Sequence, residues 1–307
     1  MRKREKRGFP GGVHPTDGYD KSMTMYRQVQ IYWPETVTIL SEQSFGGKCG
    51  LLVKPEDKVK RGDKIGNPEA FMAAPLHASV SGEVLEVKEV ENQGRNILSC
   101  IIKREEEQPE EKKSYEEELV KLSDFTKEEI IAGIRDGGLT GMGGAGFPTH
   151  KKYETDRKID AVLINAAECE PFLTCDYRLM IENGYAAVNG VRLMLKASGA
   201  EKAYICIEDN KPEAAKTLQK IIEEAKQNGM SEGEGTVEVC VLPTKYPQGG
   251  ERQLIQAVLD REVPMGGLPA DAGVIVSNIG TAKATADMIL GKMPLTRRIV
   301  TVTGWVK

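Results

Sequence analysis

From Phe125 onward the chain alternates short apolar runs with helical patterns, and this alternation constrains its fold more than any other feature. Each apolar run has the length of a buried strand, and the runs comprise residues 161–164, 203–207, 237–242, 274–276 and 299–302. Helical segments are expected after Asp176, from Asn210 as N-cap with Pro212 just inside, over Glu251–Leu259 and through Met288–Leu290. The pattern predicts an α/β domain with a mostly parallel, Rossmann-like sheet.

A glycine-rich stretch lies within this domain, Gly-Met-Gly-Gly-Ala-Gly-Phe-Pro-Thr-His at Gly141–His150. Glycines allow the backbone to take positive φ and to bring its amides close to an anion. The spacing fits G-x-G-x-x-G, but a dinucleotide-binding turn follows a strand and opens a helix. Here a predicted helix comes first, with a capping box at Thr126 and Glu129 and a glycine stop at Gly137. We therefore expect a glycine-rich loop after a helix; on its own, the stretch fits an ordinary structural turn equally well.

Residues 37–103 are predicted to form short β-strands separated by turns. They contain V-x-x-G-D-x-I ending at Ile65 and A-P-x-x-A-x-V-S-G-x-V starting at Ala74. These motifs resemble the two halves of lipoyl and biotinyl domains, which have a barrel-sandwich fold. In such carriers a lysine at the hairpin tip receives the prosthetic group, but no lysine lies between Ile65 and Ala74. We expect the fold without the carrier function.

A charged segment, Glu105–Glu118, follows with little apolar content and is predicted to be a linker. The expected organisation is a barrel-sandwich hybrid domain with an N-terminal arm at residues 1–104, a charged linker at 105–122 and an α/β domain at 123–307.

Composition excludes several classes of protein. The net charge is only −4, so nothing favours nucleic-acid binding. No apolar run approaches the roughly 20 residues of a membrane span, and no signal peptide is present. The six cysteines include no C-x-x-C pair, and Cys206 and Cys240 lie inside strand-like runs. These features favour a reducing, cytoplasmic setting and no metal site in this chain.

Polar and small residues follow three of the predicted strands, where ligands bind in parallel sheets. They occupy residues 165–176, 243–251 and 277–281. Asn165 and Asn278 could offer amide groups to a planar heterocycle, and Lys152 could offer a charge to a phosphate. Carboxylates in these regions could accept hydrogen bonds from a ribityl chain, a ribose or a ring: Glu168, Glu170 and Glu251. Solvated or helix-capping roles are the alternative for each residue alone.

With these motifs the chain resembles the RnfC family, the C subunit of the Rnf electron-transport complex. The resemblance covers essentially the whole chain and is carried by the glycine-rich stretch and by Gly11–Pro15, Asn165–Arg178, Pro243–Glu251 and Pro294–Gly304. That family is in turn similar to the flavin-carrying, NADH-binding subunit of respiratory complex I.

The resemblance implies FMN and NADH as cofactors. It assigns FMN contacts to glycines, a lysine and polar residues around the ring and phosphate: Gly141, Gly143, Gly144, Lys152, Asn165, Asn278 and Thr281. Phe147 and Glu170 match positions that meet the nicotinamide nucleotide, with Glu170 as a catalytic residue, and Glu251 matches an acid beside the flavin. Met142 and Ala167 depart from the complex I pattern, which has arginine and aspartate there.

The implied function is an FMN-dependent oxidoreductase that oxidises NADH and passes electrons to iron–sulfur or other redox partners. Familiar members of the family continue into a C-terminal part with iron–sulfur clusters, which this chain, ending at Lys307, does not contain. The expected partners are other electron-transfer subunits or an acceptor reductase, with only peripheral membrane association through partner subunits, at the cytoplasmic face of the inner membrane.

Two alternatives remain open. In the first, the chain feeds a proline reductase through Cys49, which we expect in an exposed, glycine-flanked turn where Lys48 would favour the thiolate. An incidental loop cysteine is the competing interpretation of Cys49. In the second, the chain is a non-catalytic scaffold subunit.

Overall fold

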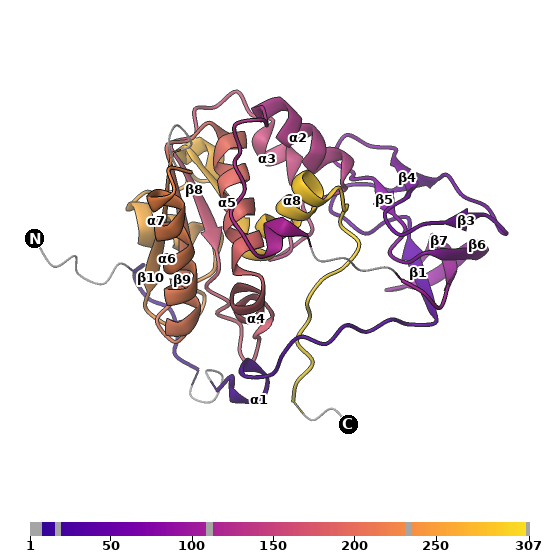
Figure 1. Ribbon diagram of the computed structural model, residues 1–307, viewed down its shortest axis with the longest axis horizontal. Coiled ribbons are helices and arrows are strands. Elements are labelled where there is room, and N and C mark those ends of the chain that lie inside the picture. Colours follow the sequence, from indigo (N-terminus) through magenta and orange to yellow (C-terminus); the bar gives the residue numbers. More distant parts are fainter. Residues whose placement is uncertain (1–7, 16–19, 109–112, 231–234, 305–307) are drawn as a thin grey trace, which may run out of the picture.

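The computed structural model describes residues 8–15, 20–108, 113–230 and 235–304. Figure 1 shows a β-domain on the right, an α/β domain on the left, and an N-terminal arm that runs beneath the α/β domain before it enters the β-domain. The arm contains one short helix, α1 (Ser22–Met25).

The β-domain consists of two antiparallel sheets around a small core. The first sheet has the order β1 (Thr36–Leu40), β7 (Arg95–Arg104), β6 (Gly82–Asn92), β3 (Lys58–Val59). The second has the order β2 (Cys49–Leu51), β4 (Lys64–Pro68), β5 (Leu76–His77). Ile65, Val84 and Ile102 are fully buried between them. The predicted barrel-sandwich fold is confirmed.

The α/β domain is built on one parallel sheet with the order β10 (Thr236–Leu242), β9 (Lys202–Glu208), β8 (Ala161–Asn165), β11 (Val274–Asn278). All four strands were predicted within one or two residues at each end, and the Rossmann-like fold class is confirmed. The predicted strand at 299–302 was wrong, since these residues pair with no strand of the described chain. Val300 and Val302 are more than two-thirds exposed. β-Branched residues favour strands where their side chains pack on a sheet, and these two side chains do not.

Helices cover both faces of this sheet. The larger core lies against α2 (Lys127–Asp136), α4 (Cys175–Glu182), α5 (Gly184–Ser198), α6 (Pro212–Gln227) and α8 (Ile279–Gly291). The smaller core lies against α7 (Glu251–Leu259) and η2 (Pro269–Ala272). Along β8, Val162 and Ile164 belong to the larger core and Leu163 to the smaller one, as expected for a strand buried on both faces.

Two helix predictions need correction. The single long helix expected after Asp176 is two helices, α4 and α5, which meet at Asn183. The N-cap of α6 is Lys211 rather than Asn210, because Lys211 is the residue with non-helical dihedral angles before Pro212. The capping box of α2 is confirmed: Thr126 Oγ1 accepts from the Glu129 amide at 3.2 Å, and Glu129 Oε2 accepts from the Thr126 amide at 2.8 Å.

A glycine fixes the crossing of α5 and α8. A Cβ added at Gly190 would lie 1.8 Å from the backbone oxygen of Ala282, so only glycine allows the two helices to approach this closely. Because α8 begins directly after β11, this crossing also fixes the first turn of α8 beneath the glycine-rich loop.

The second half of the predicted linker packs on the α/β domain. Tyr115, in the short helix η1 (Ser114–Glu116), is buried, and its hydroxyl donates to Asp287 Oδ1 at 3.0 Å. Leu119 and Leu122 join the larger core. Asn189 fastens the segment by donating to the Tyr115 carbonyl at 3.0 Å.

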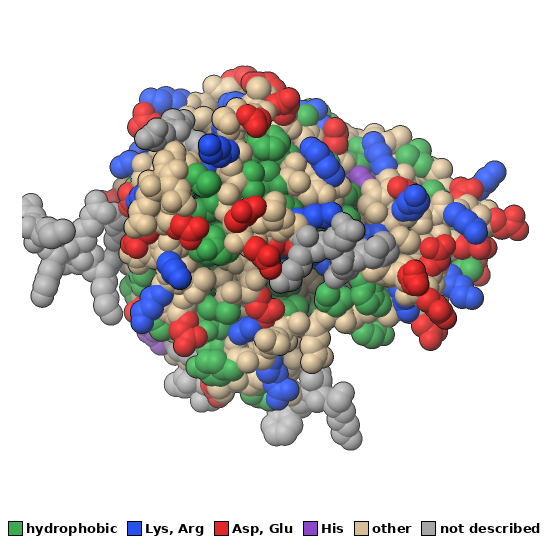
Figure 2. Space-filling model, viewed as in Figure 1, with side chains coloured by type: hydrophobic (Ala, Val, Ile, Leu, Met, Phe, Trp, Pro, Cys, Tyr) green, Lys and Arg blue, Asp and Glu red, His purple; other side chains and the backbone are tan. Residues whose placement is uncertain are grey.

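On the face shown in Figure 2, acidic and basic side chains are interspersed, so neither sign of charge dominates that face. Among the described residues, no helix combines the length and apolarity that crossing a bilayer requires.

Candidate functional site

Three segments that follow strands meet at one edge of the parallel sheet. Asn165 and Asn278 end the neighbouring strands β8 and β11 and lie opposite each other in register. Asn278 Nδ2 donates to Asp176 Oδ2 at 2.7 Å, and Asn165 Nδ2 donates to the Gly249 carbonyl at 2.8 Å. The two asparagines therefore join the segments after β8, β10 and β11.

The glycine-rich loop closes over this edge. The Met142 amide donates to Thr281 Oγ1 at 3.1 Å, which ties the loop to the first turn of α8. A Cβ at Gly143 would lie 3.2 Å from the Cβ of Asn278, whereas one at Gly144 would meet nothing within 4 Å. Gly141 closes the loop by donating to the Phe147 carbonyl at 2.9 Å. The predicted convergence of the glycines, Asn165, Asn278 and Thr281 is therefore present.

Lys152 supplies a positive charge at this edge. It lies in the short helix α3 (His150–Tyr153), which begins two residues after Pro148. Its Nζ donates to the Val276 carbonyl at 2.6 Å and lies 3.5 Å from Glu251 Oε1 at the start of α7. Lys152 and Glu251 thus form a half-exposed ion pair beside the end of β11.

The two glutamates after β8 have different environments. Glu168 caps α4, because its Oε1 accepts from the Asp176 amide at 2.7 Å and its Oε2 lies 3.3 Å from the Tyr177 amide. This is the helix-capping role that the sequence left open. Glu170 is exposed, and its Oε1 accepts from the Tyr246 hydroxyl at 3.1 Å.

Asp176 is a site residue that the sequence did not single out. Loss of solvation on burial raises its pKa to about 7, the nearby Glu168 carboxylate contributes to the rise, and the hydrogen bond from Asn278 opposes the shift. The sequence marks this residue only as a helix start. Asp176 is half-buried, and the segments that pack around it decide how much of it water reaches.

Lys21, in the arm, is a second residue that the sequence missed. It is 5% exposed, and its Nζ donates to the carbonyls of Glu168 at 2.8 Å, Glu170 at 3.1 Å and Leu173 at 2.6 Å. Burial lowers its pKa, and repulsion from Lys211 lowers it further. The arm thus shapes the loop after β8, in which Glu168 has a positive φ of 51°.

Lys211 ties the same loop from the other side. It is fully buried, and its Nζ donates to the Ala167 carbonyl at 2.7 Å and to Asn210 Oδ1 at 3.0 Å. It also lies 3.3 Å from Glu208 Oε2, whose pKa is raised by burial. Glu208 in turn accepts from the Lys245 amide at 3.2 Å, which connects the loops after β9 and β10.

Cys49 does not occupy the exposed turn expected from the sequence. It begins β2, is 3% exposed, and its Sγ donates to the Ala74 carbonyl at 3.1 Å. Burial, followed by the nearby Glu69 carboxylate, raises the pKa of the thiol. A buried thiol with a raised pKa lacks the accessible thiolate that redox exchange requires.

Phe147 lies at the far end of the glycine-rich loop, against the β-domain. Its ring centroid is 6.2 Å from that of Phe45, with 30° between the ring planes. The Phe45 amide also donates to the Gly146 carbonyl at 3.1 Å. The β-domain therefore contacts the loop directly.

Two features of the sheet edge would suit a bound cofactor. Gly143 and Gly249 let the backbone approach closely, since a Cβ at Gly249 would lie 3.2 Å from both polar side-chain atoms of Asn165. Gln248 is fully buried, yet neither Oε1 nor Nε2 has a hydrogen-bond partner within the described residues. Unpaired buried amide atoms are costly unless a ligand or water satisfies them.

Comparison with known proteins assigns the family. The Nuo51 FMN-binding domain family matches residues 134–287, half of the chain, and the RnfC barrel sandwich hybrid domain family matches residues 7–108. The chain belongs to the RnfC family. The predicted resemblance to this family is thereby confirmed.

Several relatives are components of oxidoreductase complexes. The chain is 38% identical to the C subunit of a proton-translocating ferredoxin:NAD(+) oxidoreductase complex from Clostridium ljungdahlii, over 97% of this chain and 63% of that protein. It is 40% identical to the Na(+)-translocating counterpart from Acetobacterium woodii, over 96% and 65%. The C subunit of an ion-translocating oxidoreductase complex from Vibrio cholerae is 36% identical, over 96% and 37%. The chain thus spans less than two-thirds of the length of these relatives.

A crystal structure of an NAD+-reducing NiFe hydrogenase in the H2-reduced state aligns with 53% of this chain and 30% of the hydrogenase chain. The TM-score is 0.46 and the sequence identity is 26%.

Proposed function

We propose that this RnfC-family chain binds FMN at the ends of β8 and β11 and oxidises NADH there, as the electron-entry module of an Rnf-type complex. One observation carries the proposal: the glycine-rich loop, Thr281, the two asparagines Asn165 and Asn278, and the Gly249 loop converge at one sheet edge through hydrogen bonds of 2.8–3.5 Å. Membership in a family with an FMN-binding domain supports the same conclusion.

The residues have distinct proposed roles. The backbone at Gly141, Gly143 and Gly144 can approach the phosphate and ring without a Cβ in the way, and Lys152 offers its charge to the phosphate. A bound flavin supplies the hydride acceptor and can release electrons singly or in pairs. Asn165 and Asn278 hold the two strand ends at a fixed spacing, and Glu170, with Phe147, is proposed to orient the nicotinamide nucleotide.

The onward partners are proposed from the relatives, which are subunits of ferredoxin:NAD(+) oxidoreductase complexes. Electrons would leave toward iron–sulfur or other redox subunits, and membrane association would be peripheral through those subunits. The route through Cys49 to a proline reductase gains no support, because that thiol is buried.

The test is anaerobic reduction of the FMN-reconstituted protein by NADH, measured as loss of the flavin's visible absorbance. Lys152→Gln should weaken FMN binding about tenfold or more, because a phosphate would lose a charged partner. Lys151→Gln is the matched control: its neighbouring side chain pairs with Glu154 at 2.9 Å instead, so FMN affinity should stay unchanged. An FMN-loaded protein that NADH does not reduce would contradict the proposal, and failure to bind FMN would favour the scaffold alternative.

A further inference from the structure

The N-terminal arm crosses two of the loops that follow strands as it runs beneath the α/β domain (Figure 1). Residues 8–15 lie against the loop after β10, residues 243–250, and residues 20–25 lie against the loop after β8, residues 166–174. Because β9 lies between β8 and β10 in the sheet, these two loops do not follow neighbouring strands. The arm therefore links two parts of the proposed site that the sheet holds apart.

At the loop after β10, the arm pairs with the backbone of Tyr246. The Val13 amide donates to the Tyr246 carbonyl, and the Tyr246 amide donates to the Val13 carbonyl, both at 2.8 Å. Lys245 Nζ, on the same loop, donates to the Gly11 carbonyl at 3.2 Å. A Cβ at Gly12, which has a φ of 93°, would lie 3.0 Å from the Tyr246 carbonyl oxygen, so this close approach requires glycine.

At the loop after β8, the arm binds through the buried Lys21. Its Nζ donates to the carbonyls of Glu168, Glu170 and Leu173 at 2.6–3.1 Å, so three carbonyl groups converge on one ammonium. The loop has a positive φ at two non-glycine residues, 51° at Glu168 and 64° at Phe172, a conformation that surrounding contacts must hold. Lys21 therefore fixes the path of the backbone through Glu170.

The two residues whose backbones the arm holds also meet through their side chains. The Tyr246 hydroxyl donates to Glu170 Oε1 at 3.1 Å. Glu170 is exposed, and a hydrogen bond in contact with water contributes little net free energy. This bond alone therefore does not fix the two side chains, whereas the arm restrains the backbone of each residue.

We infer that the N-terminal arm positions the pair of Glu170 and Tyr246 for the nicotinamide ring of NADH, with Lys21 as the positioning residue. The inference rests on the proposed function, in which Glu170 orients the nicotinamide nucleotide. An ammonium group has three N–H donors, and the three loop carbonyls use all of them, so Lys21 acts through the backbone of Glu170. A pair that is placed before the ligand arrives loses less conformational entropy when the ligand binds.

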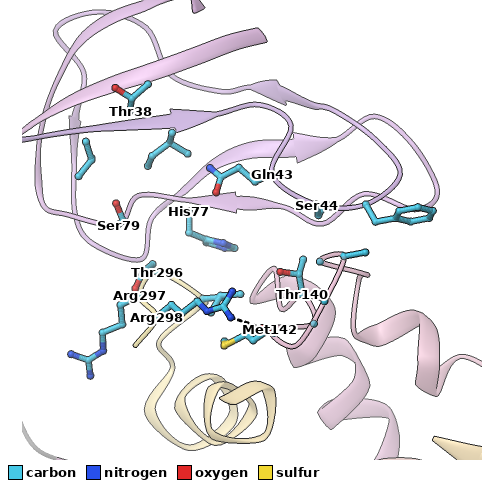
Figure 3. A pocket seen from close by; sticks show the side chains of 18 of the residues that line it. Thr38, Gln43, Ser44, His77, Ser79, Thr140, Met142, Thr296, Arg297 and Arg298 are labelled. Atoms are coloured by element: carbon cyan, nitrogen blue, oxygen red, sulfur yellow. Dashed lines mark hydrogen bonds between the residues drawn. The ribbon is translucent and has the colours of Figure 1, made fainter. Parts of the chain in front are cut away.

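The arm acts apart from the large cavity of the molecule. That cavity, of about 940 Å³, lies between the β-domain and the glycine-rich loop, with Thr38, Gln43 and His77 on one side and Thr140 and Met142 on the other (Figure 3). Within the described chain, none of the residues that line it belongs to the arm or to the loops after β8 and β10. Variants of the arm therefore leave the lining of this cavity unchanged.

The test is a calorimetric titration of the FMN-loaded full chain with tetrahydro-NAD, a reduced analogue of NADH that cannot give up hydride. Lys21→Met should raise the Kd for tetrahydro-NAD about fivefold or more, because the ligand must then order Glu170 and Tyr246 itself. The Kd for FMN, measured by quenching of the flavin fluorescence, should change about twofold or less, because the glycine-rich loop is not one of the loops that the arm crosses.

Arg27→Met is the matched control for Lys21→Met. It also removes one positive charge from the arm, but at an exposed position where Nε donates to the Met23 carbonyl of the arm itself at 2.9 Å. The Kd for tetrahydro-NAD and the Kd for FMN should each change about twofold or less.

A second pair of variants reaches the Tyr246 end of the arm and keeps the test decisive if Lys21→Met fails to fold. Gly12→Ala places a methyl group 3.0 Å from the Tyr246 carbonyl oxygen, which displaces the arm from that residue. It should raise the Kd for tetrahydro-NAD about threefold or more. Gly11→Ala is the control, since Gly11 also has a positive φ but its added Cβ would meet nothing within 4 Å. It should change the Kd about twofold or less.

A double-mutant cycle separates positioning from a general loss of order. Glu170→Gln should raise the Kd for tetrahydro-NAD less in the Lys21→Met background than in the wild type, because Lys21 acts through Glu170. Additive effects would overturn the inference. An unchanged Kd for tetrahydro-NAD in Lys21→Met, an equal rise in the Kd for FMN, or equal Kd values for Gly12→Ala and Gly11→Ala would also overturn it.

None of these results would touch the proposed function as long as NADH still reduces the flavin of the wild type. A wild type that binds FMN but is not reduced by NADH would instead contradict the proposed function itself.

Discussion

The two walls of the proposed flavin site are held in place in different ways. The strand-end wall, residues 165–176 and 243–251, is held by two buried lysines. Lys21 donates to three of its carbonyls, and Lys211 donates to the Ala167 carbonyl and also to Asn210 and Glu208 beside the wall. The glycine wall, residues 141–147, has few side chains and is held by isolated hydrogen bonds: one to Thr281, one from Arg298 and one from the β-domain.

This difference indicates that the two walls have different roles. Buried charged groups with several partners are costly to displace, so the strand-end wall can keep a fixed geometry around a ring. A loop held by isolated hydrogen bonds can shift at small cost and admit a ligand.

The largest effect is expected from Lys211→Met. The change removes three hydrogen bonds and leaves the buried Glu208 carboxylate without its ion-pair partner. Breaking a buried ion pair in this way costs about 3–5 kcal/mol of unfolding free energy. Urea unfolding measures this loss of unfolding free energy, and Lys216→Met, at an exposed position on α6, is the control. A loss as small as that of the control would show that the strand-end wall is not fixed by this lysine.

Lys21→Met should cost roughly 2–3 kcal/mol, because three carbonyls of the loop after β8 lose a buried donor. Hydrogen exchange should rise in residues 168–173 and stay constant in the glycine wall. The control is Lys54→Met, at an exposed position in the β-domain. It should change neither the unfolding free energy nor the hydrogen exchange of residues 168–173. Equal increases in both walls would mean that the arm does not act on the strand-end wall specifically.

Asp176 makes the strand-end wall sensitive to pH. Its pKa is raised to about 7, so its contribution to stability is complete below its ordinary pKa near 4 and is lost as the pH rises through about 7. His77 and His150 have pKa values lowered to about 4 and contribute in the opposite sense. Their contribution to the stability of the protein is complete above about pH 6.5 and is lost as the pH falls toward 4.

The two histidines contribute equally to the pH dependence of the wild type and of Asp176→Asn, so the difference in stability between the two proteins isolates Asp176. Between about pH 5 and pH 8 the apo wild type should lose on the order of 1–2 kcal/mol relative to the variant. Chemical denaturation at several pH values measures the difference. Parallel stability curves for the two proteins would show that the carboxyl titrates normally.

The smallest effect on stability is expected from Gly144→Ala. The added Cβ meets nothing within 4 Å, so the unfolding free energy should change by about 0.5 kcal/mol or less, while FMN binding weakens because the methyl group blocks the approach to the backbone. Gly190→Ala is the contrasting variant, since its Cβ would overlap the Ala282 backbone, and it should destabilise by about 3 kcal/mol or more. Unchanged FMN affinity in Gly144→Ala would remove the glycine wall from the flavin site.

Local patterns explain which predictions succeeded. The four strands, the helix Glu251–Leu259 and the capping box at Thr126 depend on residues near one another in sequence, so the sequence contains their signal. The meeting of Asn165 and Asn278 followed from the rule that adjacent parallel strands end at one edge.

The failures share a different cause. Cys49 and Val300 were misjudged because burial depends on what other segments cover a residue, and neither sequence neighbourhood reveals this. Lys21 contacts carbonyls about 150 positions away, and no spacing in the sequence connects the arm to that loop. The cavity lined by Thr38 of the β-domain and Gly144 of the glycine-rich loop likewise requires the relative placement of two domains.

The sequence by itself determined the two domain folds, the glycine-rich loop and the polar residues at the strand ends, because hydrophobic periodicity and short motifs act over a few residues. Only the tertiary structure decided which of these groups are buried, which lysines fix the strand-end wall, that Glu168 caps a helix, and that Asp176 has a raised pKa. Solvation and charge are set by segments distant in the chain, and packing alone brings those segments together.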